Sequence, residues 1–205
     1  MSRHAIRTLS NTRISLHPTT PIKSRPWPPP TTPAPMSTTS PSSPADTHNL
    51  SRFLHAQDHN STYRRALSEI RAGRKRSHWM WFVFPQLAGL SPSPSPTARF
   101  FAIRSLAEAE AYLSHPVLGA RLREISTAVL REGRQAGSVG GLMGGEVDVD
   151  KLRSCMTLFK RVVDGKEGKG VEEGDRIFEE VLGRWFGGEE DRRTGEVLAE
   201  RGEGR

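Results

Sequence analysis

The residues of this chain best suited to chemistry gather in one short segment, which runs from Lys75 to Gln86. A basic run enters the segment, an imidazole follows at His78, tryptophans and phenylalanines fill its centre, and an amide closes it. An imidazole titrates near neutral pH, cationic side chains pair with phosphate, and an indole offers a flat apolar face. This combination indicates a site for an anionic small molecule with a flat ring, such as a nucleotide or an ADP-ribose-like compound.

Residue type suggests a role for each group within this hypothesis. The catalytic candidates are His78, as a general acid or base, and Glu69, the carboxylate best placed near the segment. The ligand-binding candidates come from the segment and from the helices predicted around it: Gln57, Lys75, Arg76, Trp81, Gln86, Arg153 and Ser154. If the site is catalytic, the expected reaction is hydrolysis of an N-glycosidic or phosphate-ester bond.

The same residues also have structural interpretations. The run from Trp79 to Phe84 has the composition of a core segment, in which each aromatic ring buries about 150–250 Å². Glu69 lies among basic residues and is expected to form salt bridges, and a buried Gln57 would need hydrogen-bond partners. Cys155 lies on an apolar helix face and is expected to be a core residue, because a nucleophilic thiol would need His78 within reach.

Two other classes of function fit the sequence. In the first alternative the chain is a protein-interaction or regulatory module, whose basic residues between Arg64 and Arg76 meet an acidic partner. In the second it binds nucleic acid, but basic and aromatic residues are segregated here rather than interleaved, which favours a closed pocket. Convergence of Gln57, His78 and Gln86 on one cavity would favour the small-molecule hypothesis.

Composition divides the chain of 205 residues into unequal parts. Residues 1–45 hold ten of the 15 prolines, five basic residues and no acidic one, which leaves a formal charge of +2 from the total of +7 for residues 46–205. Such a Pro/Ser/Thr-rich segment buries too little apolar surface to fold, and we predict a disordered basic tail. A transit peptide within residues 1–35 is the alternative.

Several classes of site are not expected. A single cysteine excludes an intrachain disulfide, and the scattered histidines form no metal-binding motif, so we expect neither a metal nor a cofactor. No apolar run reaches the ~18 residues that a membrane span needs. We therefore expect a cytoplasmic protein, or a mitochondrial one if the transit-peptide alternative holds.

Apolar spacing predicts a mostly α protein, with one irregular helical domain of about six helices in residues 46–190. Asn49, Ser61, Ser105 and Asp175 are the expected N-caps, and Pro116 is an expected first-turn residue. The predicted helices cover residues 50–57, 61–70, 105–114, 116–131, 152–162 and 175–185. Residues 79–84 are expected as a short helix or an extended segment.

The expected loops carry their own signals. Ser91 to Pro96 is a Ser-Pro repeat and is predicted to be exposed. Residues 133–149 are glycine-rich, without the lysine of a phosphate-binding loop, and residues 164–174 form a second glycine-rich loop. Residues 191–205 are expected to be a charged C-terminal tail that frays.

Several blocks of the chain together resemble the domain-of-unknown-function 1810 family, which is often labelled calpastatin. The resemblance covers residues of about 48–190 and implies a compact, mostly helical fold. The matching blocks are Leu50–Gln57, Tyr63–Ile70, Gly73–Leu90, Ala111–Gly119 and Lys151–Phe159. The Ser-Pro repeat and the stretches 133–149 and 164–174 look longer here than in the family. The calpastatin label gains no support, because such an inhibitor would be a long, repetitive, disordered chain.

A second similarity is local. Phe53-Leu-His-Ala-Gln57 followed by Tyr63 looks like the Phe-x-Ala-Gln helix of proteins that act on ADP-ribose-type N-glycosides. It covers under a tenth of the chain, and shared helix patterning explains it equally well.

Overall fold

A computed structural model describes residues 46–133, 136–166 and 172–203 of the chain. The described residues form a mostly helical domain, as the sequence predicts, in which the extended segments pair only through one parallel bridge between Leu87 and Ile103. The tail predicted for residues 1–45 lies outside the described residues.

Within the described residues the six predicted helices are all present, together with four further α-helices, of which α3 lies in the segment expected to be a short helix or extended. The predicted ones are α1 (Ser51–Asp58), α2 (Thr62–Arg71), α5 (Leu106–Ser114), α6 (Leu118–Glu132), α8 (Glu146–Asp164) and α9 (Ile177–Phe186). The others are α3 (Met80–Val83), α4 (Pro96–Phe100), α7 (Val139–Met143) and α10 (Arg192–Glu200), with the short 3-10 helices η1 (His59–Ser61) and η2 (Glu173–Arg176).

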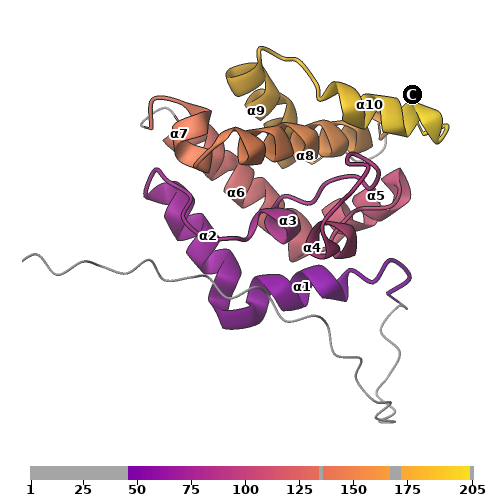
Figure 1. Cartoon of the computed structure of the whole chain (residues 1–205), viewed down its shortest axis with the longest axis horizontal. Helices are drawn as coiled ribbons and strands as arrows, with labels where there is room; N and C mark the ends of the chain where they lie inside the picture. Colours follow the sequence, from indigo (N-terminus) through magenta and orange to yellow (C-terminus); the bar gives the residue numbers. More distant parts are fainter. Residues whose placement is uncertain (1–45, 134–135, 167–171, 204–205) are drawn as a thin grey trace, which may run out of the picture. The chain divides into compact units, whose positions relative to one another are not determined.

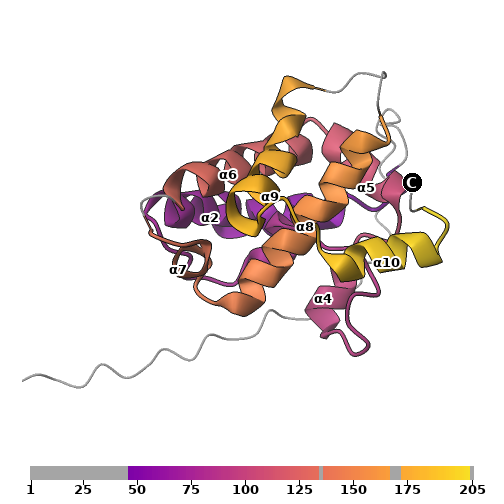
Figure 2. The same cartoon turned by 90° about the horizontal axis from the view of Figure 1, so that it is seen from above.

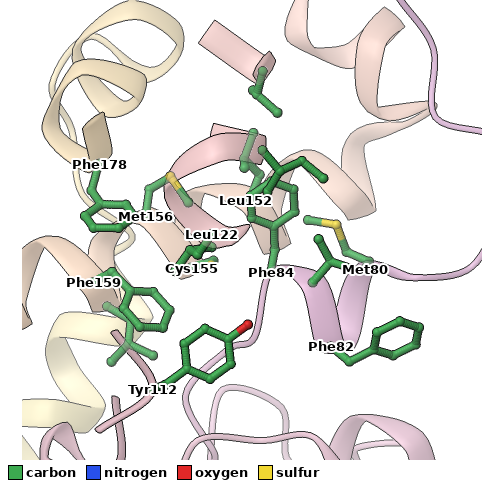
Figure 3. Close-up of a cluster of buried hydrophobic side chains, with 14 of the residues drawn as sticks. Met80, Phe82, Phe84, Tyr112, Leu122, Leu152, Cys155, Met156, Phe159 and Phe178 are labelled. Carbon is green, nitrogen blue, oxygen red and sulfur yellow. The ribbon is translucent and has the colours of Figure 1, made fainter. Parts of the chain in front are cut away.

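Helix α8 forms the centre of the domain. It packs against α5, α7, α9 and α10, which all lie along its length (Figures 1 and 2). Every residue from Ser154 to Phe159 is buried, because neighbouring helices cover α8 on several sides. Figure 3 shows Cys155, Met156 and Phe159 of α8 between Phe178 of α9 and Phe84, which follows α3.

A continuous series of aromatic rings runs through the core and joins its elements. Neighbouring ring centroids lie 5.0–5.8 Å apart, a spacing at which tilted and edge-on rings attract each other. In spatial order the rings are those of Phe82, Phe101, Phe53, Tyr112, Phe159 and Phe178. The series therefore couples the aromatic segment to α1, α5, α8 and α9.

The N-terminal ends of α1 and α2 differ from the sequence prediction. The carboxylate of Asp46, not the side chain of Asn49, accepts hydrogen bonds from the first free N–H groups of α1, at Leu50 and Ser51. Partial burial opposes charge on Asp46, but these bonds outweigh it and lower its pKa. Ser61 precedes α2 with a positive φ of 54° and makes no side-chain cap, because the chain turns sharply between α1 and α2 (Figure 1).

Other helix ends are closer to expectation. Ser105 accepts a hydrogen bond from Glu108 N at 3.1 Å and caps α5, as predicted. Helix α6 starts at Leu118 rather than at Pro116, because the His115 imidazole accepts bonds from the N–H groups that follow the proline. Gly73 has the predicted left-handed conformation after α2, with φ of 77°.

Two segments expected to be irregular are helical. The glycine-rich stretch 133–149 contains α7 and the first turn of α8, because Ser138 caps α7 and Gly144 closes it in a left-handed conformation. Residues 192–200, expected to belong to a fraying tail, form α10. Val197 and Leu198 of α10 are buried, and Asp191 caps its N-terminus, so apolar burial and capping together order this helix.

A buried ion pair links α1 to α5. The side chains of Arg52 and Glu108 are only 5% and 4% exposed, and Arg52 Nη2 donates to Glu108 Oε1. The rest of the guanidinium donates to four backbone carbonyls, those of His48, Asn49, Phe100 and Ala102, at 2.7–3.1 Å. The sequence indicated Glu108 only as part of a capping box, in which its carboxylate would accept from Ser105 N. In the structure the carboxylate accepts from Arg104 N, at 2.9 Å.

Replacing Arg52 with alanine should lower the free energy of unfolding by about 3–5 kcal/mol, because it leaves a buried carboxylate without its charge partner. Arg71→Ala is the matched control, since the Arg71–Glu124 pair is 59% and 47% exposed and should cost less than ~1 kcal/mol. Urea unfolding followed by circular dichroism measures both. Equal losses in the two variants would contradict a special role for the buried pair.

Candidate functional site

A cavity of about 320 Å³ lies beside the aromatic segment. One wall consists of Trp81 of α3 and of the chain that follows, from Gln86 to Ser91. The second wall comes from α4 and the segment between α4 and α5, and it adjoins the first wall through the Leu87–Ile103 bridge. Its volume lies at the lower end of the range of small-molecule sites, which are mostly apolar with a few polar groups.

Two arginines and no acidic residue line the cavity. The arginines are Arg99 and Arg104, and Gln86 also lines the cavity. Arg99 and Arg104 are exposed, and neither belongs to an ion pair within the described part of the chain. Such guanidinium groups suit a carboxylate or a phosphate, which they can bind in a bidentate way.

Two buried polar side chains of α1 hold the two walls. Arg52 binds the carbonyls of Phe100 and Ala102 in one wall. Gln57 donates to the carbonyl of Phe82, in the helix that carries Trp81, at 2.8 Å. The position of the cavity therefore depends on α1, although no α1 residue lines it.

The Gln57 amide is fully used in this structural role. Besides the Phe82 carbonyl, its Nε2 donates to the Tyr112 hydroxyl at 3.0 Å, and its Oε1 accepts from Arg121 at 3.2 Å. Gln57 is only 2% exposed. It was predicted to contact a ligand, but it lies in the core with its polar atoms paired.

Arg201, which follows α10, binds both walls of the cavity. The guanidinium of Arg201 donates to the carbonyls of Ala88 and Arg104, and it thereby links the two walls. Gly89 has a positive φ of 94°, and a Cβ there would lie 3.3 Å from Arg201 Nη2 and 3.6 Å from Val197. A glycine at this position thus lets the chain turn against α10.

Trp81 contacts a charged cluster. Lys151 Nζ lies 4.6 Å from the centre of the Trp81 ring, a cation–π distance. Lys151 and Lys75 both pair with Asp148, at 2.8 and 2.5 Å. Partial burial disfavours the Asp148 carboxylate, but hydrogen bonds from the two lysines overcome it and lower the pKa of Asp148. Lys75, predicted to hold an anionic ligand, is therefore already paired with a carboxylate, which it shares with Lys151.

The Glu69 carboxylate accepts hydrogen bonds that hold the loop between α2 and α3. It accepts from the backbone N–H groups of Arg76 and Ser77, from the Ser77 hydroxyl and from Trp79 Nε1, at 2.5–3.0 Å. Partial burial raises the pKa of Glu69, but the hydrogen bonds lower it by more. The pKa of Glu69 is therefore below its usual value. Glu69 forms no salt bridge with any of the described residues, because its carboxylate binds the loop between α2 and α3 instead.

The remaining predicted site residues lie elsewhere. His78 and Arg76 are exposed in the loop before α3. Arg153 binds the carbonyl and carboxylate of Glu189, and the buried Ser154 hydroxyl lies 3.0 Å from the Thr194 hydroxyl. Neither Arg153 nor Ser154 lines the cavity.

Cys155 is fully buried, and burial raises the pKa of its thiol. With His78 exposed at the surface, the two side chains do not form the nucleophile and base pair that a thiol mechanism needs. Cys155 is a core residue, in agreement with the structural interpretation of its helix face.

Of the nine predicted site residues, the structure brings only Trp81 and Gln86 together in the cavity. Gln57, His78 and Gln86 do not converge. The roles assigned to the other residues stay predictions, and the geometry points to a different set of cations, Arg99 and Arg104.

Comparison with known proteins connects this site to a family. A family model described as "Protein of unknown function (DUF1810)" matches residues 47–198. The chain belongs to this family. A search of the curated proteins found no match.

The DUF1810 domain also resembles a solved structure. The crystal structure of the conserved hypothetical protein Rv1873 from Mycobacterium tuberculosis shares 45% sequence identity with it, with a TM-score of 0.64. The match covers 75% of this chain and 99% of the mycobacterial chain. That protein is described only as a conserved hypothetical protein, so the comparison supports the fold and assigns no activity.

Two further classes of site can be assessed within the described residues of the DUF1810 domain. No group of three or more His, Cys, Asp and Glu side chains there could hold a metal ion. None of the described helices has both the length and the apolar character that crossing a bilayer requires.

Sequence reasoning missed Arg99 and Arg104, which the DUF1810 domain places on the cavity wall. A signal was available, because Arg99 and Arg104 bracket a short apolar run that contains Phe100 and Phe101.

Replacing Glu69 with glutamine should destabilise the domain by about 1–3 kcal/mol at pH 7, because a neutral amide accepts the same bonds more weakly. The folded pKa of Glu69 is lowered from 4.5, so its carboxylate stabilises the fold above that pH and loses this effect as the pH falls through the folded pKa. The stability difference between wild type and Glu69→Gln should therefore shrink between pH 5 and pH 3.

Urea unfolding at stepwise pH measures this difference. Glu180→Gln is the control, because Glu180 is an exposed residue of α9 and the variant should follow the wild type at every pH. A stability gap for Glu69→Gln that stays constant with pH would contradict the assigned role.

Proposed function

We propose that this DUF1810 domain binds an anionic small molecule with a flat ring in the cavity between α3 and α4. One observation carries the proposal: Trp81 and Gln86 line the same cavity as Arg99 and Arg104, and no carboxylate lines it. Apolar walls with a few convergent polar groups are typical of small-molecule sites.

Each lining group has a defined contribution in this proposal. The half-buried Trp81 ring provides an apolar face for a flat ring, and the Gln86 amide offers hydrogen bonds to the ring edge. Arg99 and Arg104 neutralise a phosphate or carboxylate at the mouth. A nucleotide or an ADP-ribose-like compound combines these features.

The proposal is for binding rather than for hydrolysis. Neither His78 nor Glu69 lines the cavity, and the hydrogen bonds to Glu69 favour its charged form, which is the wrong form for a general acid. The proposed binding function therefore includes no catalytic role for His78 or Glu69. The binding roles of Trp81 and Gln86 are kept from the sequence, and the anion-binding role passes from Lys75 to Arg99 and Arg104.

Thermal unfolding in the presence of a nucleotide panel at millimolar concentration tests the proposal. A ligand that binds the folded state raises the melting temperature, and one present at ~100 times its Kd stabilises by about 2.7 kcal/mol. Arg104→Ala and Trp81→Ala should each remove most of the rise. Arg76→Ala is the matched control, since Arg76 is an exposed arginine outside the cavity and its loss should leave the rise intact.

No melting shift with any nucleotide, nicotinamide dinucleotide or ADP-ribose would refute the proposal. An equal loss of the shift in Arg76→Ala and Arg104→Ala would also contradict it, because non-specific charge would then explain the binding.

A protein-interaction role is the second candidate, and one surface favours it. Arg64, Arg65, Arg74 and Arg76 are exposed on α2 and the loop after it, and none has a carboxylate partner in the ion pairs of the described residues. An acidic protein segment would complement this surface. We expect Arg74→Glu with Arg76→Glu to abolish binding to immobilised polyglutamate, while Arg99→Glu with Arg104→Glu retains it. Preferential binding to single-stranded RNA with a steep salt dependence would instead favour the nucleic-acid alternative.

A further inference from the structure

The Ser-Pro repeat forms part of the cavity mouth. Ser91 and Pro94 are lining residues, together with Arg99 and Arg104. The repeat connects the two walls, because it follows Leu90 of one wall and leads into α4 of the other. A change in this loop therefore acts directly on the arginines to which the proposed function assigns the anion.

The three serines of the repeat have different surroundings. Ser95 caps α4, with its Oγ accepting from Ala98 N at 3.1 Å. Ser93 is exposed but does not line the cavity. Ser91 is exposed and also lines the cavity, and its Oγ accepts a long hydrogen bond of 3.3 Å from Ser93 N. Ser91 is thus the serine that is both accessible to another protein and next to the arginines.

Arginine lies within reach of this loop. Arg99 Nη2 donates to the Pro94 carbonyl at 3.3 Å, which places its guanidinium against the repeat. Arg104 lines the same cavity. A phosphoserine carries a charge of about −1.5 to −2 at pH 7, and opposite two arginines it forms charge-assisted hydrogen bonds that order a loop.

We propose that Ser91 is a phosphorylation site for a proline-directed protein kinase, and that its phosphate occupies the anion subsite formed by Arg99 and Arg104. The serine is followed directly by Pro92, within an exposed segment that a kinase can take up in extended form. The consequence drawn for ligand binding rests on the proposed function, whereas the modification and its arginine contacts do not.

The transfer itself balances with ATP as the phosphoryl donor. The Ser91 hydroxyl oxygen attacks the γ-phosphorus, the bond from that phosphorus to the β–γ bridging oxygen breaks, and ADP leaves. The hydroxyl proton passes to the catalytic base of the kinase. The product phosphate would then compete with the phosphate of a nucleotide for the same two guanidinium groups.

The first test is modification of the folded full-length protein. Incubation with a proline-directed serine kinase and Mg-ATP, followed by tandem mass spectrometry, should place phosphate on Ser91. The double variant Ser93→Ala with Ser95→Ala should still take up one phosphate in this loop, and adding Ser91→Ala should abolish that uptake. Modification of Ser93 or Ser95 alone, or none while a control peptide is phosphorylated in the same tube, would overturn the proposal.

The second test asks where the phosphate sits. In the Ser93→Ala, Ser95→Ala protein phosphorylated on Ser91, a phosphorus NMR titration should give a second phosphate pKa lower by about 0.5 unit or more than in a peptide of residues 86–98 with the same phosphate. Adding Arg99→Ala and Arg104→Ala should return it to the peptide value, whereas Arg76→Ala should not. A titration identical to that of the peptide would overturn the arginine contacts.

The third test links the modification to the proposed function. Phosphorylation of Ser91 should weaken binding of adenosine monophosphate at least tenfold, and unchanged affinity would overturn competition at the subsite. If adenosine monophosphate binds neither form while the first two tests succeed, the proposed ligand fails and the phosphorylation site stands.

Discussion

The arrangement of this domain depends on one buried guanidinium. Arg52 donates hydrogen bonds to four carbonyls and to one carboxylate, and it thereby joins the chain before α1, the end of α4, the segment after α4 and the start of α5. A buried charge is costly unless every group around it is satisfied. Here the five N–H groups of the arginine meet acceptors in five positions, so four segments are held in a single geometry.

The same principle recurs where Glu69 holds the loop between α2 and α3. That loop has no regular hydrogen bonding of its own, and one carboxylate supplies acceptors for two of its N–H groups, a hydroxyl and an indole. Buried or half-buried polar side chains thus hold the irregular segments in place, because these segments lack the backbone hydrogen bonds of a helix. The aromatic segment is fixed from one end by Glu69 and in its middle by Gln57.

The cavity forms between irregular segments that polar side chains hold in place. Its walls are short or irregular segments, namely α3, α4 and the two stretches joined by the Leu87–Ile103 bridge, and hydrogen bonds from α1 and Arg201 hold them in place. The hydrogen bonds that polar side chains lining the cavity donate to nearby carbonyls are long, from Gln86 to Phe84 and from Arg99 to Pro94, each of 3.3 Å. Arg99 and Arg104 lack acidic partners, while most polar groups predicted as site residues, such as Gln57, Lys75 and Arg153, are already paired.

The sequence by itself determined the helical class, the six main helices, the family and the central position of the aromatic segment, because apolar spacing and capping are local properties of the chain. It also distinguished Trp81 from its neighbours as a cavity residue. Only the tertiary structure decided which polar side chains form hydrogen bonds or ion pairs within the fold. Whether Glu69 meets a ligand or a loop depends on the backbone amides seven and eight residues away, and whether an arginine is free depends on carboxylates brought by distant helices. Such pairings join residues far apart in the sequence, such as Arg52 and Glu108, which are 56 positions apart, and no local pattern encodes them.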